Sequence, residues 1–213
     1  MISSWLDDLP AFRREHFQRA PFARPAVARR AMRLLTWDTV RRLVEVGADM
    51  LVVRNGQLVD DRPATFAEAL TLFREGYSLV LRRCEKHDPA LRALADSVAG
   101  EFEGDVSIQV YATPASHHSF GWHYDCEDVF IAQTLGRKEY FLRANTVNPE
   151  PHIERMPHDM HYEREVTPAM ASTLEPGDWL YVPRGWWHMA RAYEDSLSIS
   201  IGVLSPAAGG HSR

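Results

Sequence analysis

Residues 121–140, "GWHYDCEDVFIAQTLGRKEY", decide the fold because they set charged side chains inside an apolar, β-branched pattern. The pattern predicts one strand across "HYDCEDVFIAQT" and a second across "KEYFLRA", joined as a hairpin at Leu135-Gly136. Side chains two apart on a strand share a face, so His123 and Asp125 are expected to point the same way. The same face is predicted to carry Val129, Ile131 and Gln133.

That face is apolar, and an ionised carboxylate there costs free energy unless a cation pairs with it. A divalent metal held by His123 and Asp125 together is one answer. The alternative is a hydrogen-bonded His–Asp pair with a structural role, a pattern that also arises by chance.

A third candidate ligand follows a Pro-Gly turn in "EPGDWLYVPRGWWH", residues 175–188. His188 lies 65 residues after His123, so only neighbouring strands of one barrel can bring the two together. Two histidines and one carboxylate make the facial triad that leaves open positions on Fe(II). The alternative is a histidine at the barrel rim, packed against Trp186 and Trp187.

Lys138 is the third element of this pattern. If its strand pairs with the His123 strand, Lys138 and Tyr140 share one face and enter the same cavity. A lysine that points into a barrel needs an anion, and an incoming carboxylate would supply it. The alternative is an exposed lysine beside Arg137 at a hairpin.

The first hundred residues read mainly as helices. "LTWDTVRRLVEVG" ends at Gly47, "TFAEALTLFREG" opens with a Thr65–Glu68 capping box, and "HDPALRALADSVAG" opens with Asp88 as N-cap. Between the first two, "LVVRNGQLV" predicts a hairpin through its Asn-Gly pair.

After residue 100 strands dominate, with "VSIQVYA", "DWLYVP" and "SLSISIGV" joining the two runs already named. We expect one mainly β structural domain with N-terminal α-helices: residues 1–100 as a helical region with a hairpin packed on the barrel, 101–206 as the barrel core and 207–213 as a tail. The polar stretch 148–168 is expected to be a long excursion between two strands, possible cover for the barrel mouth.

Composition narrows the class of protein. The chain has 213 residues, 45% of them hydrophobic and 25% charged, and no apolar run approaches a membrane span. Residues 1–42 hold nine Arg and four acids, a net charge of +5. The whole chain has a net charge of −5, so residues 43–213 carry −10. Such a basic excess is too weak for a nucleic-acid binder and favours a solvated helical face. With only Cys84 and Cys126 and an acidic start, we expect a reducing, cytoplasmic setting and no membrane.

On these residues the sequence resembles the cupin-type, JmjC-related Fe(II)- and 2-oxoglutarate-dependent oxygenases. "HYDCEDVFIAQTLGRK" is similar to both the ribosomal oxygenase (Cupin-4) group and the asparaginyl hydroxylase of hypoxia-inducible factor, and "GDWLYVPRGWWH" resembles the second family motif. "HFQRAPFARP" and "VYATPASHHSFGWHYD" resemble further Cupin-4 segments, so the likeness covers about residues 16–205.

The resemblance implies a double-stranded β-helix, the jelly-roll or cupin barrel. It implies Fe(II) bound by His123, Asp125 and His188, 2-oxoglutarate held at its distal carboxylate by Lys138, and O2 as oxidant. The implied reaction hydroxylates an unactivated C–H bond and releases succinate and CO2. The cavity hydroxyls that would assist Lys138 are Ser198, Ser200, Thr113 and Ser119.

Several alternatives stay open. Ribosomal oxygenases continue into dimerisation and winged-helix-like regions that have no counterpart here, so the substrate can be a protein, a peptide or a small molecule, and a homodimer stays open. The function alternatives are a metal-binding cupin with isomerase or cosubstrate-independent dioxygenase activity, and a non-catalytic barrel. Glu127, one step beyond Asp125 on the ligand face, could support a ligand or contact the substrate, and Cys126 is expected to be a packed thiol.

Overall fold

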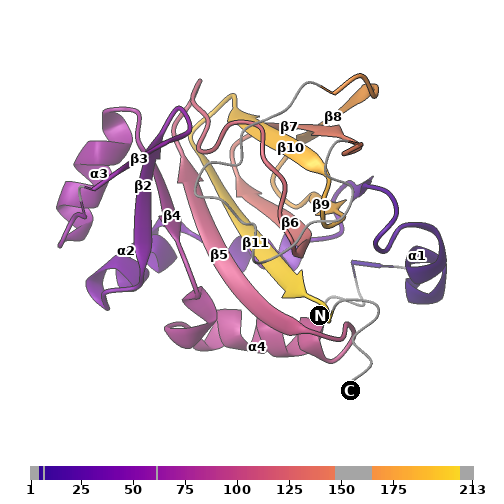
Figure 1. Ribbon diagram of the computed structural model, residues 1–213. Coiled ribbons are helices and arrows are strands. Elements are labelled where there is room, and N and C mark those ends of the chain that lie inside the picture. The colour runs from indigo at the N-terminus through magenta and orange to yellow at the C-terminus, as the bar shows by residue number, and fades with distance from the viewer. Residues whose placement is uncertain (1–4, 7, 61, 147–164, 207–213) are drawn as a thin grey trace, which may run out of the picture.

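Two antiparallel sheets face each other in the computed structural model, which describes residues 5–6, 8–60, 62–146 and 165–206 (Figure 1). The larger sheet has the strand order β1-β9-β6-β11-β5-β4-β2-β3, and the smaller has the order β10-β7-β8. The larger sheet contains β1 (Phe22–Arg24), β2 (Met50–Arg54), β3 (Gln57–Val59), β4 (Ser78–Leu81), β5 (Asp105–Thr113), β6 (Asp128–Leu135), β9 (Trp179–Val182) and β11 (Ser196–Leu204). The smaller contains β7 (Lys138–Arg143), β8 (Ala169–Leu174) and β10 (Trp187–Ala192). The predicted mainly β fold is confirmed.

The helices lie where the sequence predicts them, and their caps explain why. Thr65 and Glu68 form the expected capping box, and the Asp88 carboxylate accepts from the first-turn amides at 2.9 and 3.1 Å. Asn55 and Gly56 turn the expected hairpin with φ of 51° and 80°. The helical elements are α1 (Leu9–Glu15), η2 (Arg29–Arg33), α2 (Trp37–Glu45), α3 (Phe66–Arg74), η3 (Cys84–Lys86) and α4 (Pro89–Ala99). No helix in the described ranges is both long and apolar enough to cross a membrane.

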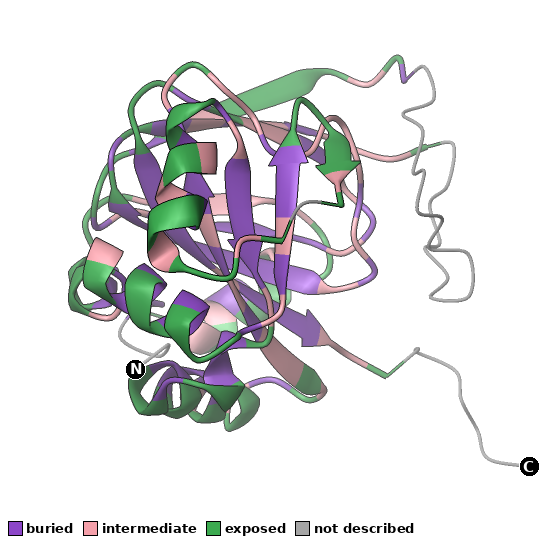
Figure 2. Ribbon diagram, turned by 90° about the vertical axis from the view of Figure 1, so that its left-hand side faces the viewer, coloured by how far each residue is buried: buried purple, intermediate pink, exposed green. Residues whose placement is uncertain are grey.

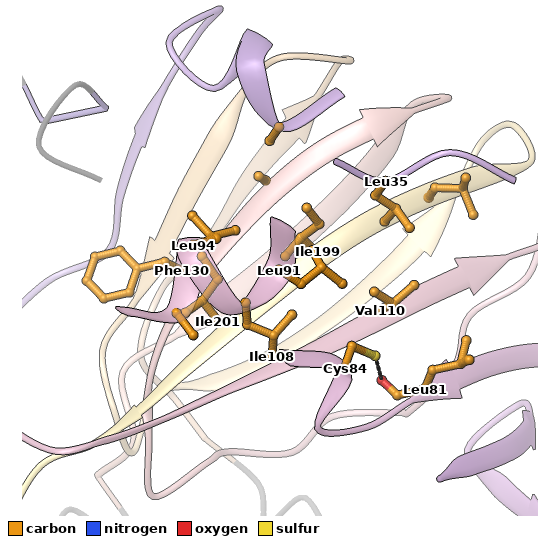
Figure 3. Packing of buried hydrophobic residues seen from close by; sticks show 14 of the residues in the cluster. Leu35, Leu81, Cys84, Leu91, Leu94, Ile108, Val110, Phe130, Ile199 and Ile201 are labelled. Atoms are coloured by element: carbon orange, nitrogen blue, oxygen red, sulfur yellow. Dashed lines mark hydrogen bonds between the residues drawn. The ribbon is translucent and has the colours of Figure 1, made fainter. Parts of the chain in front are cut away.

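The main core lies between the outer face of the larger sheet and the N-terminal helices. Leu91 and Leu94 of α4 meet Ile108 of β5 and Ile201 of β11, all fully buried (Figure 3). The helices turn exposed residues outward and buried ones toward the sheet (Figure 2). Burial of this apolar face fixes which side of the sheet is left to form a cavity.

A second, smaller core fills the space between the two sheets. Val129 and Ile131 of β6 face it from the larger sheet, and Tyr140 and Leu142 of β7 face it from the smaller. The predicted sharing of one face by Val129 and Ile131 is confirmed. This inner space is the interior of the jelly roll.

The predicted hairpin between the β6 and β7 strands is wrong. β6 pairs with β11 and β9, whereas β7 pairs with β10 and β8 in the other sheet. The two strands also differ in their burial pattern: β6 is buried nearly throughout, whereas β7 alternates between buried and partly buried residues. The turn at Gly136 therefore carries the chain from one sheet to the other, because turn residues show where a chain reverses but not which strand it then joins.

The predicted strand across residues 123–134 is also too long. β6 begins at Asp128, and His123 forms only an isolated bridge with His188, through two backbone hydrogen bonds of 3.0 and 2.7 Å. Asp125 lies between these two points, outside any strand.

The expected boundary at residue 100 does not interrupt the larger sheet, because β4 pairs with β5 across it. The N-terminal region therefore extends the sheet in addition to packing on it. Most of the expected excursion at 148–168, and the tail at 207–213, lie outside the described residues.

Candidate metal centre

Three side chains from different parts of the chain converge inside the barrel. One ligand atom each from His123, Asp125 and His188 lies within 4.8 Å of the other two. The first two come from the segment before β6, and His188 comes from β10 of the smaller sheet. The backbone bridge between the two histidines brings their rings to a centroid distance of 4.2 Å.

Backbone carbonyls orient both imidazoles. His123 Nδ1 lies 2.8 Å from the Gly121 carbonyl oxygen, and His188 Nδ1 lies 3.0 Å from that of Trp186. Because a carbonyl oxygen only accepts, each Nδ1 carries a proton and each Nε2 is turned to the centre. This is the tautomer that a metal-binding histidine needs.

The protonation states also suit a metal. Burial, then the neighbouring His188, lowers the pKa of His123 to about 4, so its Nε2 lone pair is free at neutral pH. Burial opposes ionisation of Asp125, but the hydrogen bond from His188 and the two nearby histidines lower its pKa to about 2. Burial lowers the pKa of His188, but Asp125, 3.4 Å from His188 Nε2, outweighs burial and raises it. Two imidazoles and a carboxylate fit Fe(II), which would displace the shared proton.

Lys138 enters the same cavity from β7 and is 3% exposed. Its ammonium donates to Thr113 Oγ1 at 3.2 Å and lies 5.3 Å and 5.6 Å from the ring centres of Tyr111 and Tyr140. Within the described residues no carboxylate pairs with it. Burial alone lowers its pKa to about 7, so the ammonium lacks the anion that would hold its charge.

The predicted hydroxyls surround this lysine at different distances from the cavity. Ser119 and Ser200 line the cavity directly. Thr113 contacts Lys138 and lies 3.3 Å from the Ser119 hydroxyl. Ser198 is buried and hydrogen-bonds Tyr140, which itself lines the cavity. The roles of these four residues stay predictions.

The remaining sequence candidates take other places. Trp187 is fully buried and donates to Glu165 at 3.0 Å, and Trp186 packs against the inner core. Cys126 is a buried free thiol outside the metal group. His117 lies against Gly76 at the end of α3 and does not line the cavity.

Sequence reasoning missed two residues that line the cavity, Tyr111 and Phe120, although Tyr111 was detectable because it shares a strand face with Thr113. It also missed a buried carboxylate outside the cavity. Asp128 is fully buried and accepts from Tyr181 Oη at 2.5 Å and from Gln18 Nε2 at 3.1 Å. Gln18 and Asp128 are 110 residues apart in the sequence, so no local sequence pattern predicts their contact.

Known proteins with a similar sequence share this region. The family profile described as JmjC domain matches residues 86–210. A bifunctional lysine-specific demethylase and histidyl-hydroxylase NO66 of Dictyostelium discoideum is 35% identical over 135 residues, which are 62% of this chain and 26% of that protein. Ribosomal oxygenase 1 of Rattus norvegicus is 29% identical over 136 residues, 63% of this chain and 23% of that protein. The chain thus aligns with only about a quarter of the length of these relatives.

Solved structures support the fold. The structure of the ycfD protein of Escherichia coli superimposes with a TM-score of 0.68 at 22% identity. The match covers 94% of this chain and 54% of the ycfD chain. A second structure of this ribosomal oxygenase, in complex with cobalt and 2-oxoglutarate, has a TM-score of 0.67 at 21% identity, covering 94% and 52%. Because the JmjC match spans more than half of the 213 residues and includes every ligand of the converged triad, the chain belongs to the JmjC domain family.

Proposed function

We propose that this chain is an Fe(II)- and 2-oxoglutarate-dependent oxygenase that hydroxylates an unactivated C–H bond. The products would be a hydroxylated protein, peptide or small molecule, succinate and CO2. One observation carries the proposal: His123, Asp125 and His188 share a cavity with Lys138, a buried cation without a carboxylate partner among the described residues.

The iron would supply the redox chemistry with O2. The residues of the chain hold the ion, bind the cosubstrate and exclude water. His123, Asp125 and His188 hold the ion on one side and leave its other side facing the cavity. Lys138 binds and orients the far carboxylate of the cosubstrate, assisted by the Thr113 hydroxyl that it already contacts. The apolar side chains of Phe120, Val129, Ile131 and Ala190 line the same cavity and exclude water from the reacting centre.

Lys138 separates this proposal from the other metal-dependent reactions of cupin barrels. Those reactions need the metal ligands but no deep cation, and an unpaired buried ammonium is costly to retain. An open dicarboxylate site explains that cost. The convergence of all three candidate ligands likewise argues against a barrel that only mediates contacts.

The test is anaerobic loading with Fe(II), followed by measurement of O2-dependent succinate release from 2-oxoglutarate. We expect release by the unaltered protein and a loss of at least about a hundredfold in His123→Ala, because a ligand is missing. Lys138→Ala should raise the KM for 2-oxoglutarate by about tenfold or more. The chain has only one other lysine, the exposed Lys86, so Lys86→Ala is the matched control. Metal-loaded protein that releases no succinate in any preparation contradicts the proposal.

We propose further that the protein works in a reducing, cytoplasmic setting. Cys84 and Cys126 are both free in the structure, and the Cys84 thiol is fully buried. Fractionation of the source cells, with thiol titration of the purified protein, tests this, and a disulfide between the two cysteines contradicts it.

A further inference from the structure

Gln133 is a polar residue of β6 to which neither the metal centre nor the cosubstrate site gives a role. It is fully buried, and its position along the strand matches that of Val129 and Ile131, yet it is not among the residues that line the cavity. Its side-chain nitrogen instead donates to the Leu135 carbonyl at 2.8 Å and to the Gly136 carbonyl at 2.9 Å. Both protons of the amide therefore hold the turn that carries the chain from one sheet to the other.

The oxygen of the same amide shows that these two bonds decide how the side chain lies. Gln133 Oε1 is buried and has no hydrogen-bond partner in the part of the chain that is described. A buried polar atom without a partner costs free energy, so an apolar side chain would fill this space at a lower cost. The two bonds donated to the turn offset that cost.

The turn that Gln133 holds decides which residue enters the cavity. It joins the last residue of β6 to Lys138, the first residue of β7. Side chains alternate along a strand, so a slip of one residue would turn Lys138 away from the cavity and bring Arg137 or Glu139 toward it. The register of β7 must therefore be fixed where the strand begins.

Lys138 needs this support because the cavity does not neutralise it. Its ammonium has the Thr113 hydroxyl at 3.2 Å but no carboxylate partner among the described residues, and a long lysine side chain can reach water if its backbone shifts. On the other side of the turn, the Tyr193 amide donates to the Arg137 carbonyl at 2.9 Å. Gln133 supplies the second attachment, so the turn is held from both sides.

We propose that Gln133 is a positioning residue, which acts through the Leu135-Gly136 turn to hold Lys138 inside the cavity before the cosubstrate binds. The inference rests on the proposed function, which gives Lys138 its role with 2-oxoglutarate. Loss of the two donated bonds should weaken binding of 2-oxoglutarate and leave metal binding unchanged, because none of the three candidate metal ligands lies on this turn.

The test compares the unaltered full chain with Gln133→Met, which removes both donors and nearly keeps the length and volume of the side chain. We expect the Kd of the Mn²⁺-loaded protein for 2-oxoglutarate to rise about tenfold in the variant, and the Kd for Mn²⁺ to stay within about twofold. Calorimetric titration measures both constants.

A second readout needs no ligand. The chain has two lysines, so selective ¹³C labelling gives one NMR signal for Lys138 and one for the exposed Lys86. Burial lowers the pKa of Lys138 to about 7. In Gln133→Met this pKa should move toward the ordinary lysine value of about 10.4, because the side chain then spends time in water. The Lys86 signal should titrate as before.

Thr134→Val is the matched control. Thr134 is the next residue of β6, is also buried, and donates to the Leu197 carbonyl of β11 at 3.1 Å, away from the turn. Its variant should lower the midpoint of urea unfolding, as Gln133→Met should, but keep the affinity for 2-oxoglutarate and the Lys138 pKa. Gln133→Asn, whose shorter amide cannot reach both carbonyls, should give smaller changes and decides the question if Gln133→Met does not fold.

The possible results separate this inference from the proposed function. If 2-oxoglutarate binds and a folded Gln133 variant changes neither its Kd nor the Lys138 pKa, the inference is overturned. Equal changes in Thr134→Val overturn it as well, since the effect is then a general loss of stability. If the unaltered protein binds no 2-oxoglutarate, the proposed function fails, and the Lys138 pKa alone decides whether Gln133 positions the lysine.

Discussion

Lys138 is the buried cation of the candidate site. It is buried, its ammonium touches one hydroxyl and two aromatic rings, and no carboxylate among the described residues neutralises it. The neighbouring residue does not predict the burial of Lys138, because Arg137 is half exposed and pairs with Glu194 at 2.9 Å. The two adjacent cations therefore differ in burial, since Arg137 lies in the turn before β7 whereas Lys138 begins β7 and faces the cavity.

The charge of Lys138 should depend on the cosubstrate. Burial lowers its pKa to about 7 in the free protein, and a bound carboxylate favours the charged form, so binding should raise this pKa. Affinity for 2-oxoglutarate should therefore be full below about pH 7 and fall by up to tenfold per pH unit above it. The two lysines of the chain give two ¹³C signals after lysine labelling, and a titration with and without 2-oxoglutarate follows Lys138 directly.

Lys138→Arg serves as the control for that titration. It removes the Lys138 signal and so assigns it, and a guanidinium stays charged at every pH used, which should flatten the affinity profile. A Lys138 signal that titrates near the ordinary lysine pKa of about 10.4 in the free protein contradicts the prediction.

At the scale of elements, the N-terminal helices and hairpin support the loop that enters the site. The Gly56 amide donates to the Ser119 carbonyl at 2.8 Å, and the His117 imidazole lies against Gly76 at the end of α3. Ser119 lines the cavity, so elements outside the JmjC match fix part of its wall.

A pair of helix-terminal glycines tests this support. Gly76 (φ +93°) and Gly47 (φ +74°) both follow helix ends in the left-handed region, but an added Cβ meets His117 Nε2 at 2.6 Å in the first and open space in the second. Gly47→Ala should lower the free energy of unfolding by about 1–2 kcal/mol from backbone strain, and Gly76→Ala by about 1–3 kcal/mol more. Urea unfolding measures both.

The double variant Gly76→Ala with His117→Ala isolates the contact. Without the imidazole, the excess cost at Gly76 should disappear and leave the cost seen at Gly47. Equal losses of unfolding free energy in Gly47→Ala and Gly76→Ala would show that His117 does not pack tightly against the end of α3.

Element positions were largely predictable from the sequence because their signals are local. The Thr65–Glu68 box, the Asp88 cap and the Asn55-Gly56 turn each depend on residues within four positions, and the structure confirms all three. Strand pairing was not predictable. The hairpin expected at Leu135-Gly136 was wrong because the partners of β6 and β7 lie between 26 and 75 residues away along the chain.

At the scale of the whole molecule, the candidate metal ligands come from the two different sheets. Asp125 leads into β6 of the larger sheet, and His188 belongs to β10 of the smaller one. An ion bound by both would cross-link the sheets and would bind the folded chain far better than the unfolded one.

Metal binding should therefore stabilise the protein against heat. At a free Mn²⁺ concentration a hundred times Kd, the expected gain is about 2.7 kcal/mol, or roughly 5–10 °C in Tm for a chain of this size. A chelator should reverse the gain, and calorimetry measures it. His188→Ala should abolish it, whereas His87→Ala, at an exposed position, should keep it. The same gain in His188→Ala would place the ion elsewhere.

The sequence by itself determined which groups are available at the candidate site. Two imidazoles, a carboxylate and a lysine are fixed by residue type, and strand alternation correctly put Lys138 and Tyr140 on one face. Tertiary structure alone decided how they meet: the crossing between sheets at Gly136, the bridge from His123 to His188 and the reach of Gln18 to Asp128. The physical reason is range, since caps, turns and alternation act within a few residues, whereas these contacts form only when the whole apolar core closes around them.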